Sequence, residues 1–292
     1  MKKIRIGING FGRIGRQLTK LILNSNMTEL VAINDLADSK TSAHLFKYDT
    51  SYGVFNGDVN YNDSEIIING SRIKKFTERD PAQINWTDKK VDIVVESTGI
   101  FTKKAQAEKH ISGTVKKVII SAPATDEDIT IVLGVNEENY NPKLHNIISN
   151  ASCTTNCVAP MVKVLNENFS IQHALMSTIH SFTNDQSVLD QPHSDLRRSR
   201  TASENIIPTT TGAAKAVVQV IPEMKGKIDG MAYRIPTASV SVTDLTISLN
   251  KKTTSDEINS VFESASKNEL KGFLEYSDLP LVSQDFKGNP HS

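Results

Sequence analysis

A cysteine in a run of small polar residues is the first feature that could do chemistry. Cys153 lies in the segment SNASCTTNC, residues 149–157, which leads into a predicted helix. The helix dipole and the unpaired N–H groups of a first helical turn favour the thiolate form of a thiol placed there. The sequence therefore predicts a nucleophile at Cys153. The alternative is a packed thiol, because a free cysteine is often just a small buried apolar residue.

A nucleophilic thiol needs a base, and the chain has seven histidines. His180 lies near the end of an alternating, strand-like segment with polar neighbours, and it is the candidate base for Cys153. The other six lie in segments with less polar company: His44, His110, His145, His173, His193 and His291. Cys157, one helical turn after Cys153, is expected to be a packed, reduced thiol. No Cys/His cluster completes a metal-ligand set, so no metal is expected.

A glycine-rich segment near the N-terminus matches the pattern G-x-G-x-x-G. Its members are Gly10, Phe11, Gly12, Arg13, Ile14 and Gly15. It follows a predicted strand and opens a predicted helix, and Asp35 ends the next strand about 20 residues later, as in dinucleotide-binding proteins. The glycines let the backbone approach a pyrophosphate, whereas the carboxylate accepts ribose hydroxyls and repels a 2′-phosphate. NAD is thus favoured over NADP, the alternative being a plain strand–helix turn.

Further polar residues suggest the ligand crevice and two anion sites. Thr98 and Ser121 follow later strands, at the sheet edge where such folds bind ligands. Three arginines lie in DLRRSR: Arg197, Arg198 and Arg200. Thr211 and Gly212 precede a helix, and Arg234 closes a strand. Arginine forks and helix N-termini suit phosphate; the alternative for the arginine run is a solvated or subunit-facing surface.

The elements that must position these residues change character along the chain. Strands at 3–8, 28–33, 91–95 and 117–120 alternate with a helix at 12–24, which predicts a parallel sheet covered by helices. Residues 58–76 predict antiparallel strands with a turn at Asn69-Gly70. After Ser149 come a helix, long alternating strands at 172–183, 230–234 and 239–249, and a helix at 253–267 capped by Thr254 or Ser255. Residues 187–208 predict a long functional loop.

Composition excludes several classes of protein. The chain has 292 residues, with 33 basic and 33 acidic side chains and a formal charge of zero, which argues against a nucleic-acid site held by phosphate contacts. No apolar run approaches the roughly 18 residues of a membrane span. The N-terminus lacks the apolar core of a signal peptide, so a cytoplasmic protein is expected. The length suggests two domains, placed at 1–152 and 153–292.

Taken in order, six segments closely resemble the phosphorylating glyceraldehyde-3-phosphate dehydrogenase family. They are INGFGRIGR, SNASCTTNCVAP, HSFTNDQ, DLRRSR, IPTTTGAAKAV and GMAYRIPTASVSVTDL, and the match covers essentially the whole chain. The resemblance implies a Rossmann-type parallel-sheet domain that binds NAD, followed by an α+β catalytic domain with a mostly antiparallel sheet. It implies a glycolytic oxidoreductase that converts D-glyceraldehyde 3-phosphate and inorganic phosphate into 1,3-bisphosphoglycerate through a thiohemiacetal and a thioester.

The same resemblance implies roles for individual residues. Cys153 would be the nucleophile and His180 its base. Thr183 and Arg234 would hold the substrate's C3 phosphate. The inorganic-phosphate site would comprise Ser152, Thr154, Arg198, Thr211 and Gly212. Arg13 and Ile14 would contact the cofactor pyrophosphate, Asp35 the adenosine ribose, and Arg79, Thr98 and Ser121 would line the cofactor further. Residues 184–208 resemble a loop that packs against a neighbouring subunit in a homotetramer.

Two departures from the family pattern matter. Gln191-Pro192 stands where NAD-type members often have Leu-Pro, with the proline retained. The family continues beyond Ser292 with a strand, a WYDNEWGYS-like segment carrying an asparagine that orients the nicotinamide, and a helix. We expect a chain without them to expose an edge and apolar surface and to be poorly active. The alternatives are an erythrose-4-phosphate or semialdehyde dehydrogenase, or an inactive, truncated interaction protein.

Overall fold

The computed structural model describes residues 2–292 and divides into two compact units. The first unit comprises the chain up to Thr130 together with Tyr140–Ala151. The second comprises Ile131–Asn139 together with Ser152–Ser292. The short stretch 131–139 therefore packs with the second unit although it lies within the predicted first domain.

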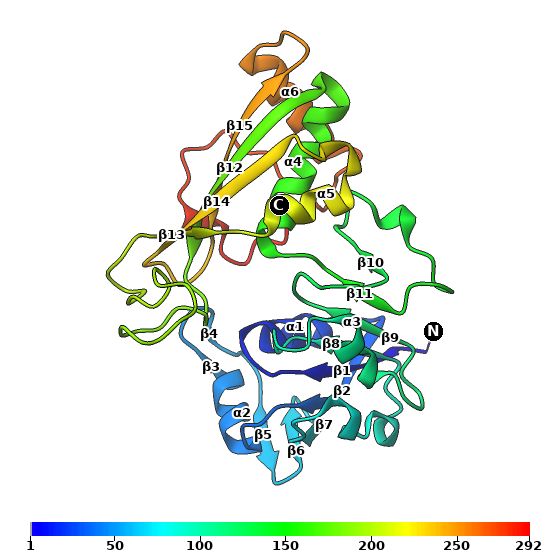
Figure 1. Cartoon of the computed structure of the whole chain (residues 1–292). Helices are drawn as coiled ribbons and strands as arrows, with labels where there is room; N and C mark the ends of the chain where they lie inside the picture. The colour runs from blue at the N-terminus through cyan, green and yellow to red at the C-terminus, as the bar shows by residue number, and fades with distance from the viewer. Residues whose placement is uncertain (1) are drawn as a thin grey trace. The chain divides into compact units, whose positions relative to one another are not determined.

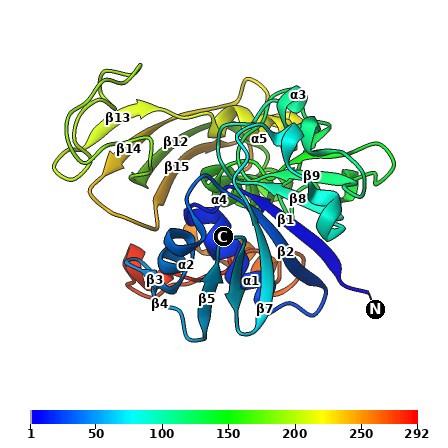
Figure 2. The ribbon, with the colours of Figure 1, turned by 90° about the horizontal axis from the view of Figure 1, so that it is seen from below.

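The first unit is built on a nine-stranded sheet in the order β10-β11-β9-β8-β1-β2-β7-β6-β5. The strands from β10 to β7 in this order pair in parallel, and β6 and β5 add antiparallel pairs at one edge. Figure 2 shows β8, β1, β2 and β7 side by side. The predicted parallel sheet is confirmed. Its strands are β1 (Ile4–Asn9), β2 (Thr28–Asn34), β5 (Val59–Asn62), β6 (Glu65–Ile68), β7 (Ser71–Phe76), β8 (Ile93–Glu96), β9 (Lys117–Ile120), β10 (Ile129–Thr130) and β11 (Ile147–Ser149).

Helices and a small hairpin complete the first unit: α1 (Arg13–Leu23), α2 (Ser39–Lys47), α3 (Lys104–Ala107) and the pair β3 (Tyr48–Asp49) with β4 (Gly53–Val54). Two apolar clusters cover the sheet. One joins β1, β2, β6 and β7 to α1 and α2 around Ile8, Ile33 and Phe46. The other gathers around Trp86, Val94 and Val118. Burial on both faces explains why the parallel strands are short and rich in valine and isoleucine.

A single two-residue turn produces the antiparallel pairing at this edge of the sheet. Asn69 and Gly70 both have positive φ, 49° and 80°, as a two-residue type I′ hairpin requires. The turn joins β6 to β7 in antiparallel register, as predicted. β7 also pairs in parallel with β2, through Ala32↔Lys74 to Asn34↔Phe76, so the hairpin extends the main sheet.

The second unit contains a four-stranded sheet in the order β13-β14-β12-β15 (Figure 1). β12 pairs antiparallel with β15 and in parallel with β14, and β13 pairs antiparallel with β14. The sheet is therefore mostly antiparallel, with one parallel pair at its centre. Its elements are α4 (Cys153–Phe169), β12 (Ile171–Ser181), β13 (Ile207–Thr210), α5 (Ala213–Val220), β14 (Ile228–Ile235), β15 (Val242–Leu249) and α6 (Ser255–Lys267).

A helix cap explains where α6 begins, and alternation of buried and exposed side chains explains β12. Thr254 and Glu257 form a reciprocal capping box that starts α6, so Thr254 is the N-cap. In β12 the side chains of Ala174, Met176 and Thr178 are buried, whereas Leu175 is exposed. One face of this sheet is thus covered and the other is open, as the alternating pattern predicts. Residues 182–206, all described, form no helix or strand, which confirms the long loop, except that Ile207 and Pro208 of the predicted range 187–208 belong to β13.

Candidate active site

The second unit brings Cys153 and His180 together. Cys153 is the first residue of α4, and His180 is the penultimate residue of β12, so the two side chains come from positions 27 residues apart. Ser152 is the N-cap of α4, and its hydroxyl accepts from the N–H of Thr155 at 3.0 Å. The Cys153 Sγ lies 3.3 Å from His180 Nε2. The predicted pair is therefore within hydrogen-bond distance.

The two cysteines differ in acidity, and both are free thiols. Burial opposes ionisation of Cys153, but hydrogen bonding and charge from His180, together with the hydroxyl and N–H of Thr154, outweigh it and lower the pKa of the thiol. Solvent still reaches Cys153. Burial raises the pKa of Cys157, despite a hydrogen bond from Thr243. Cys153 is therefore the more acidic thiol of the pair, and the predicted nucleophile is the one whose surroundings favour the thiolate.

The far side of the His180 ring is fixed by a backbone carbonyl. His180 Nδ1 lies 2.6 Å from the carbonyl oxygen of Ser181. Because a carbonyl only accepts, this contact places a proton on Nδ1 and leaves Nε2 of the neutral ring as an acceptor facing the thiol. Arg234, which is His180's register partner on β14, donates from Nη1 to the same carbonyl at 3.0 Å. The 3.0 Å between Nη1 and Nδ1 thus separates two donors that share one acceptor.

Arg234 has unused hydrogen-bonding capacity. Burial lowers the pKa of its guanidinium, and the nearby charge of Arg198 lowers it further, against the opposing effects of Cys153 and Asp185. Among the described residues no partner is found for its buried Nε. A buried, unpartnered donor beside a reactive thiol marks a place for an anion, since leaving such a group unsatisfied costs free energy.

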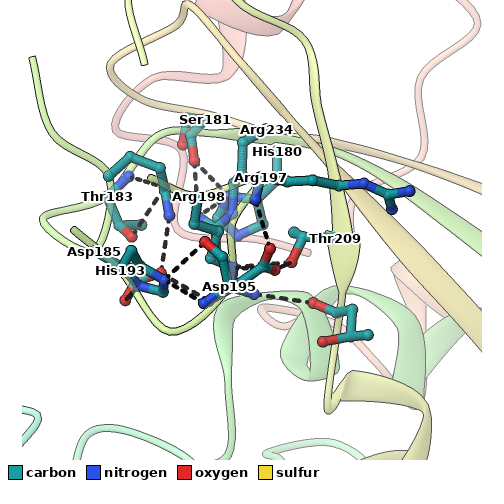
Figure 3. Close-up of polar contacts among 12 residues, drawn as sticks. His180, Ser181, Thr183, Asp185, His193, Asp195, Arg197, Arg198, Thr209 and Arg234 are labelled. Atoms are coloured by element: carbon teal, nitrogen blue, oxygen red, sulfur yellow. Dashed lines mark hydrogen bonds and ion pairs between the residues drawn. The ribbon is translucent and has the colours of Figure 1, made fainter. Parts of the chain in front are cut away.

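Hydrogen bonds to residues between 185 and 210 hold the Arg198 side chain in place (Figure 3). Its Nη1 donates to Asp185 Oδ2 at 2.7 Å, its Nε to Thr209 Oγ1 at 2.9 Å and its Nη2 to the carbonyl of Thr210 at 3.1 Å. Asp195 accepts from the Thr209 hydroxyl at 2.8 Å. The other arginines of the run differ from Arg198: Arg197 is exposed, and Arg200 pairs with Asp190 at 2.8 Å.

The remaining predicted anion-site residues lie at helix starts and loop ends. The Thr183 N–H and hydroxyl both reach Gln186 Oε1, at 3.0 and 3.4 Å. Thr211 Oγ1 accepts from the N–H of Ala213 at 3.2 Å, and Gly212 is the N-cap of α5. Thr154 is buried in the first turn of α4.

Sequence reasoning missed several polar contacts. Asp185 and Gln186 bind Arg198 and Thr183, and nothing in a loop without periodicity could pair them in advance. The expectation of less polar company was wrong for His193, whose Nε2 lies 3.2 Å from Asp185 Oδ1. It was also wrong for His110, whose Nε2 lies 3.1 Å from Glu96. Both contacts depend on residues that are distant in the chain or in an irregular loop.

The glycine-rich segment of the first unit fits a dinucleotide. Gly10 has φ +91°, and a Cβ there would lie 2.7 Å from the N of Thr98. A Cβ on Gly15 would lie 2.2 Å from the carbonyl oxygen of Gly10, so α1 packs closely on the loop. A Cβ on Gly12 would meet no atom within 4 Å among the described residues, which leaves room beside the N-terminus of α1. These are the three roles of glycine in a dinucleotide loop.

Asp35 lies directly against this loop. Its Oδ2 accepts from the N–H of Phe11 at 2.7 Å, and its Oδ1 accepts from the N–H of Ala37 at 2.9 Å. A carboxylate has further lone pairs, so Asp35 can still accept ribose hydroxyls. The other predicted cofactor residues belong to the same unit: Arg13, Ile14 and Arg79 are exposed, and Thr98 and Ser121 follow β8 and β9.

Within residues 2–292, no three His, Cys, Asp or Glu side chains lie together in a group that could hold a metal ion. No helix in this range combines the length and apolar character needed to cross a membrane.

Comparisons with known proteins match both units. Residues 4–104 match the family described as glyceraldehyde 3-phosphate dehydrogenase, NAD binding domain, and residues 152–292 match its C-terminal domain. Glyceraldehyde-3-phosphate dehydrogenase 1 of Bacillus cereus is 60% identical over 97% of this chain and 85% of its own length. Glyceraldehyde-3-phosphate dehydrogenase 2 of Streptomyces avermitilis is 58% identical over 99% of this chain and 87% of its own. The Geobacillus stearothermophilus glyceraldehyde-3-phosphate dehydrogenase is 55% identical over 98% of this chain and 85% of its own length.

Proposed function

Since the chain belongs to the glyceraldehyde-3-phosphate dehydrogenase family and is an NAD-dependent oxidoreductase, we propose that it oxidises D-glyceraldehyde 3-phosphate and traps the product with inorganic phosphate as 1,3-bisphosphoglycerate. The observation that carries this proposal is the 3.3 Å contact between Cys153 Sγ and His180 Nε2, with the thiol pKa lowered. A thiolate beside a histidine is suited to covalent catalysis on a carbonyl.

Cys153 and His180 divide the chemistry. The Cys153 thiol passes its proton to His180 Nε2, and the thiolate adds to the aldehyde carbon while N–H groups of the first turn of α4 stabilise the oxyanion. The oxyanion takes that proton back from His180, which completes the thiohemiacetal and leaves Nε2 free to accept again. His180 Nε2 takes the hydroxyl proton as the thiohemiacetal loses a hydride and becomes a thioester. Bound NAD supplies the hydride acceptor. The thioester keeps the free energy of oxidation in a reactive bond, and attack by phosphate releases the acyl phosphate and the Cys153 thiolate.

Arg234 and Arg198 supply the anion sites. Arg234, with its unpartnered Nε, would bind the C3 phosphate of the substrate together with Thr183. Arg198 would bind inorganic phosphate with Ser152, Thr154, Thr211 and Gly212. Arg198 now pairs with Asp185, so an arriving phosphate has to compete with that carboxylate for the guanidinium. Charge-assisted hydrogen bonds of this kind are roughly twice as strong as neutral ones.

The first unit would bind the cofactor. The loop from Gly10 to Gly15 and the N-terminus of α1, including Arg13 and Ile14, would hold the pyrophosphate, and Asp35 would hold the adenosine ribose. Arg79, Thr98 and Ser121 would line the rest of the site. Asp35 disfavours a 2′-phosphate by charge repulsion, which supports NAD over NADP.

The test is NADH formation from glyceraldehyde 3-phosphate, with and without inorganic phosphate, for the wild type and for Cys153→Ser. We expect phosphate-dependent turnover that the substitution abolishes. Turnover without any phosphate dependence would reject the reaction proposed here. Preference for erythrose 4-phosphate or a semialdehyde would support the other dehydrogenases, and NAD binding without turnover would support an interaction protein.

Assembly and location are proposed on related grounds. The loop 182–206 exposes Val188, Leu189 and Leu196, each more than three-quarters accessible to solvent. Such apolar surface supports a contact with a second copy, and we propose a homotetramer. Light scattering of the purified chain tests this. The reaction needs a free Cys153 thiol, which fits the reducing cytoplasm.

A further inference from the structure

A buried carboxylate at the carboxyl end of β8 takes no part in the chemistry above. Glu96 is 1% exposed. Its Oε2 accepts from Asn9 Nδ2 at 2.5 Å and contacts His110 Nε2 at 3.1 Å. Its Oε1 accepts from the N–H of Thr98 at 2.8 Å and from the Thr98 hydroxyl at 2.5 Å. Four groups therefore surround one carboxylate in a site closed to water.

The single tryptophan of the chain fixes the protonation of this cluster. Trp86 Nε1 lies 3.1 Å from His110 Nδ1, and both residues are fully buried. An indole N–H only donates, so His110 Nδ1 must accept. The proton of the neutral ring is then on Nε2, where it donates to Glu96. All four contacts of Glu96 thus come from donors, and both of its carboxyl oxygens act as acceptors.

The cluster also ties together the segments that carry the proposed cofactor residues. Asn9 precedes Gly10, and its Oδ1 accepts from Asn34 Nδ2 at 2.7 Å. Asn34 precedes Asp35 and exchanges two hydrogen bonds with the backbone of Glu78, at 2.8 and 2.9 Å. Glu78 in turn precedes Arg79. One chain of hydrogen bonds, buried at Asn9, Asn34 and Glu96 and exposed at Glu78, therefore connects the ends of β1, β2 and β8 with the segment that follows β7.

We propose that Glu96 is a positioning residue for NAD, acting through Thr98 and through the strand ends joined by Asn9 and Asn34. The proposal rests on the cofactor site proposed above. The backbone of Thr98 packs closely against Gly10, since a Cβ on Gly10 would lie 2.7 Å from the Thr98 N. A change in the hydrogen bonding of Glu96 therefore displaces the loop on which the cofactor lies. His110 and Trp86 hold the carboxylate from behind.

The substitution Glu96→Gln keeps the shape of the side chain but turns one oxygen into a donor. If the new NH₂ faces Asn9 and His110, it meets the N–H donors of these two side chains. If it faces Thr98, it meets the N–H and hydroxyl donors of that residue. His110 cannot relieve the conflict by moving its proton to Nδ1, because that atom faces the Trp86 N–H. We expect an increase of about 10-fold in the dissociation constant for NAD, the scale expected for unsatisfied buried donors.

A second substitution is expected to restore the pairing of hydrogen-bond donors with acceptors around position 96. Asn9→Asp places a carboxylate where it still accepts from Asn34 and can accept from the new amide at position 96. His110 Nε2 lies 3.5 Å from Asn9 Nδ2, so the new oxygen is also within its reach. The double variant Asn9→Asp/Glu96→Gln should therefore bind NAD within about 3-fold of the wild type, since the coupling of neighbours is not additive.

The matched control is Asp128→Asn. Asp128 belongs to the same unit and accepts from Lys104 and from the N–H groups of Asn146 and Ile147, at 2.6 to 2.8 Å. It contacts none of the proposed cofactor residues. We expect this variant to lose thermal stability while its affinity for NAD stays within 2-fold of the wild type.

The measurement is calorimetric titration of the 292-residue chain with NAD, with tryptophan emission as a second readout because only Trp86 contributes to it. The positioning role of Glu96 is supported if Glu96→Gln binds NAD more weakly and has altered tryptophan emission, and if the double variant recovers both properties. A folded Glu96→Gln that binds NAD like the wild type would overturn the proposal, as would a folded double variant without recovery.

A fallback variant and a binding assay that needs no turnover keep the test decisive. If Glu96→Gln does not fold, His110→Phe removes one donor behind the carboxylate without touching Thr98; about 3-fold weaker NAD binding is then expected, and no change would overturn the proposal. A wild type that binds NAD without oxidising glyceraldehyde 3-phosphate would overturn the proposed reaction alone, because the titrations need no turnover.

Discussion

Replacing His180 with glutamine should make the Cys153 thiol a much weaker acid. The pKa of Cys153 reflects an opposition between burial, which raises it, and His180 and Thr154, which lower it. Without the imidazole, the burial effect remains and the main opposing group is gone. The pKa of Cys153 should therefore rise above the ordinary value of a thiol.

The 3.3 Å separation of Sγ and Nε2 sets the size of the effect. At this separation, opposite unit charges attract by about 1.3 kcal/mol in bulk water and about 5 kcal/mol at an effective dielectric constant of ~20. Solvent reaches Cys153, so the lower half of this range applies. A loss of about 1.5–3 kcal/mol corresponds to a rise of roughly 1–2 pKa units.

The assay is the rate of alkylation by iodoacetamide between pH 5 and 10, because only the thiolate reacts. We expect the midpoint for His180→Gln to lie about 1–2 pH units above that of the wild type, with similar rates at high pH. At pH 7 the variant should react roughly 10–100-fold more slowly. Cys153→Ser gives the background from Cys157. An unchanged midpoint in a folded His180→Gln would refute the role of His180 in ionising the thiol.

Three other predictions concern single positions. Arg234→Leu should raise KM for glyceraldehyde 3-phosphate by about 30–100-fold and impair oxidation of unphosphorylated glyceraldehyde far less, which steady-state kinetics on both substrates would check. Gly15→Ala should lower the thermal melting temperature and weaken NAD binding, because its Cβ would lie 2.2 Å from the Gly10 carbonyl; wild-type melting would contradict the close packing of α1. The pKa of Asp128 is lowered, since Lys104 and two N–H groups outweigh its burial. Its contribution to stability is therefore present at neutral pH and lost as the pH falls through the lowered value. Urea unfolding should show Asp128→Asn less stable than the wild type at pH 7, by about 1–2 kcal/mol, with the difference shrinking in acid; a constant difference would contradict this.

Local patterns predicted the parts of the site that lie within one turn or one motif. Small residues around Cys153 and the capping hydroxyl of Ser152 indicate a helix start, and the structure begins α4 there. The spacing of Gly10, Gly15 and Asp35 likewise indicates a strand–loop–helix unit, and Asp35 does accept a hydrogen bond from the loop. In both cases the physical requirement acts over a few residues, so composition and spacing reveal it.

Contacts between distant segments were not predictable in the same way. The bond between Asp185 and Arg198 forms inside a loop without periodicity, so no repeating pattern fixes which charges meet. Nothing in the local sequence around His110 distinguishes it from a surface histidine, and its partners Trp86 and Glu96 come from other elements. The placement of 131–139 with the second unit also depends on packing that no local signal contains.

The central position of β12 in its sheet has a consequence for synthesis on the ribosome. All nine strands of the first sheet precede residue 150, so that sheet can form early. β12 ends at Ser181, but both of its neighbours are translated later: β14 ends at Ile235 and β15 ends at Leu249. At about 5–20 residues per second, the nascent chain carries β12 with two unpaired edges for several seconds. During that interval this strand is the natural target for a chaperone, and pausing of translation between β12 and β15 should increase aggregation of the nascent chain.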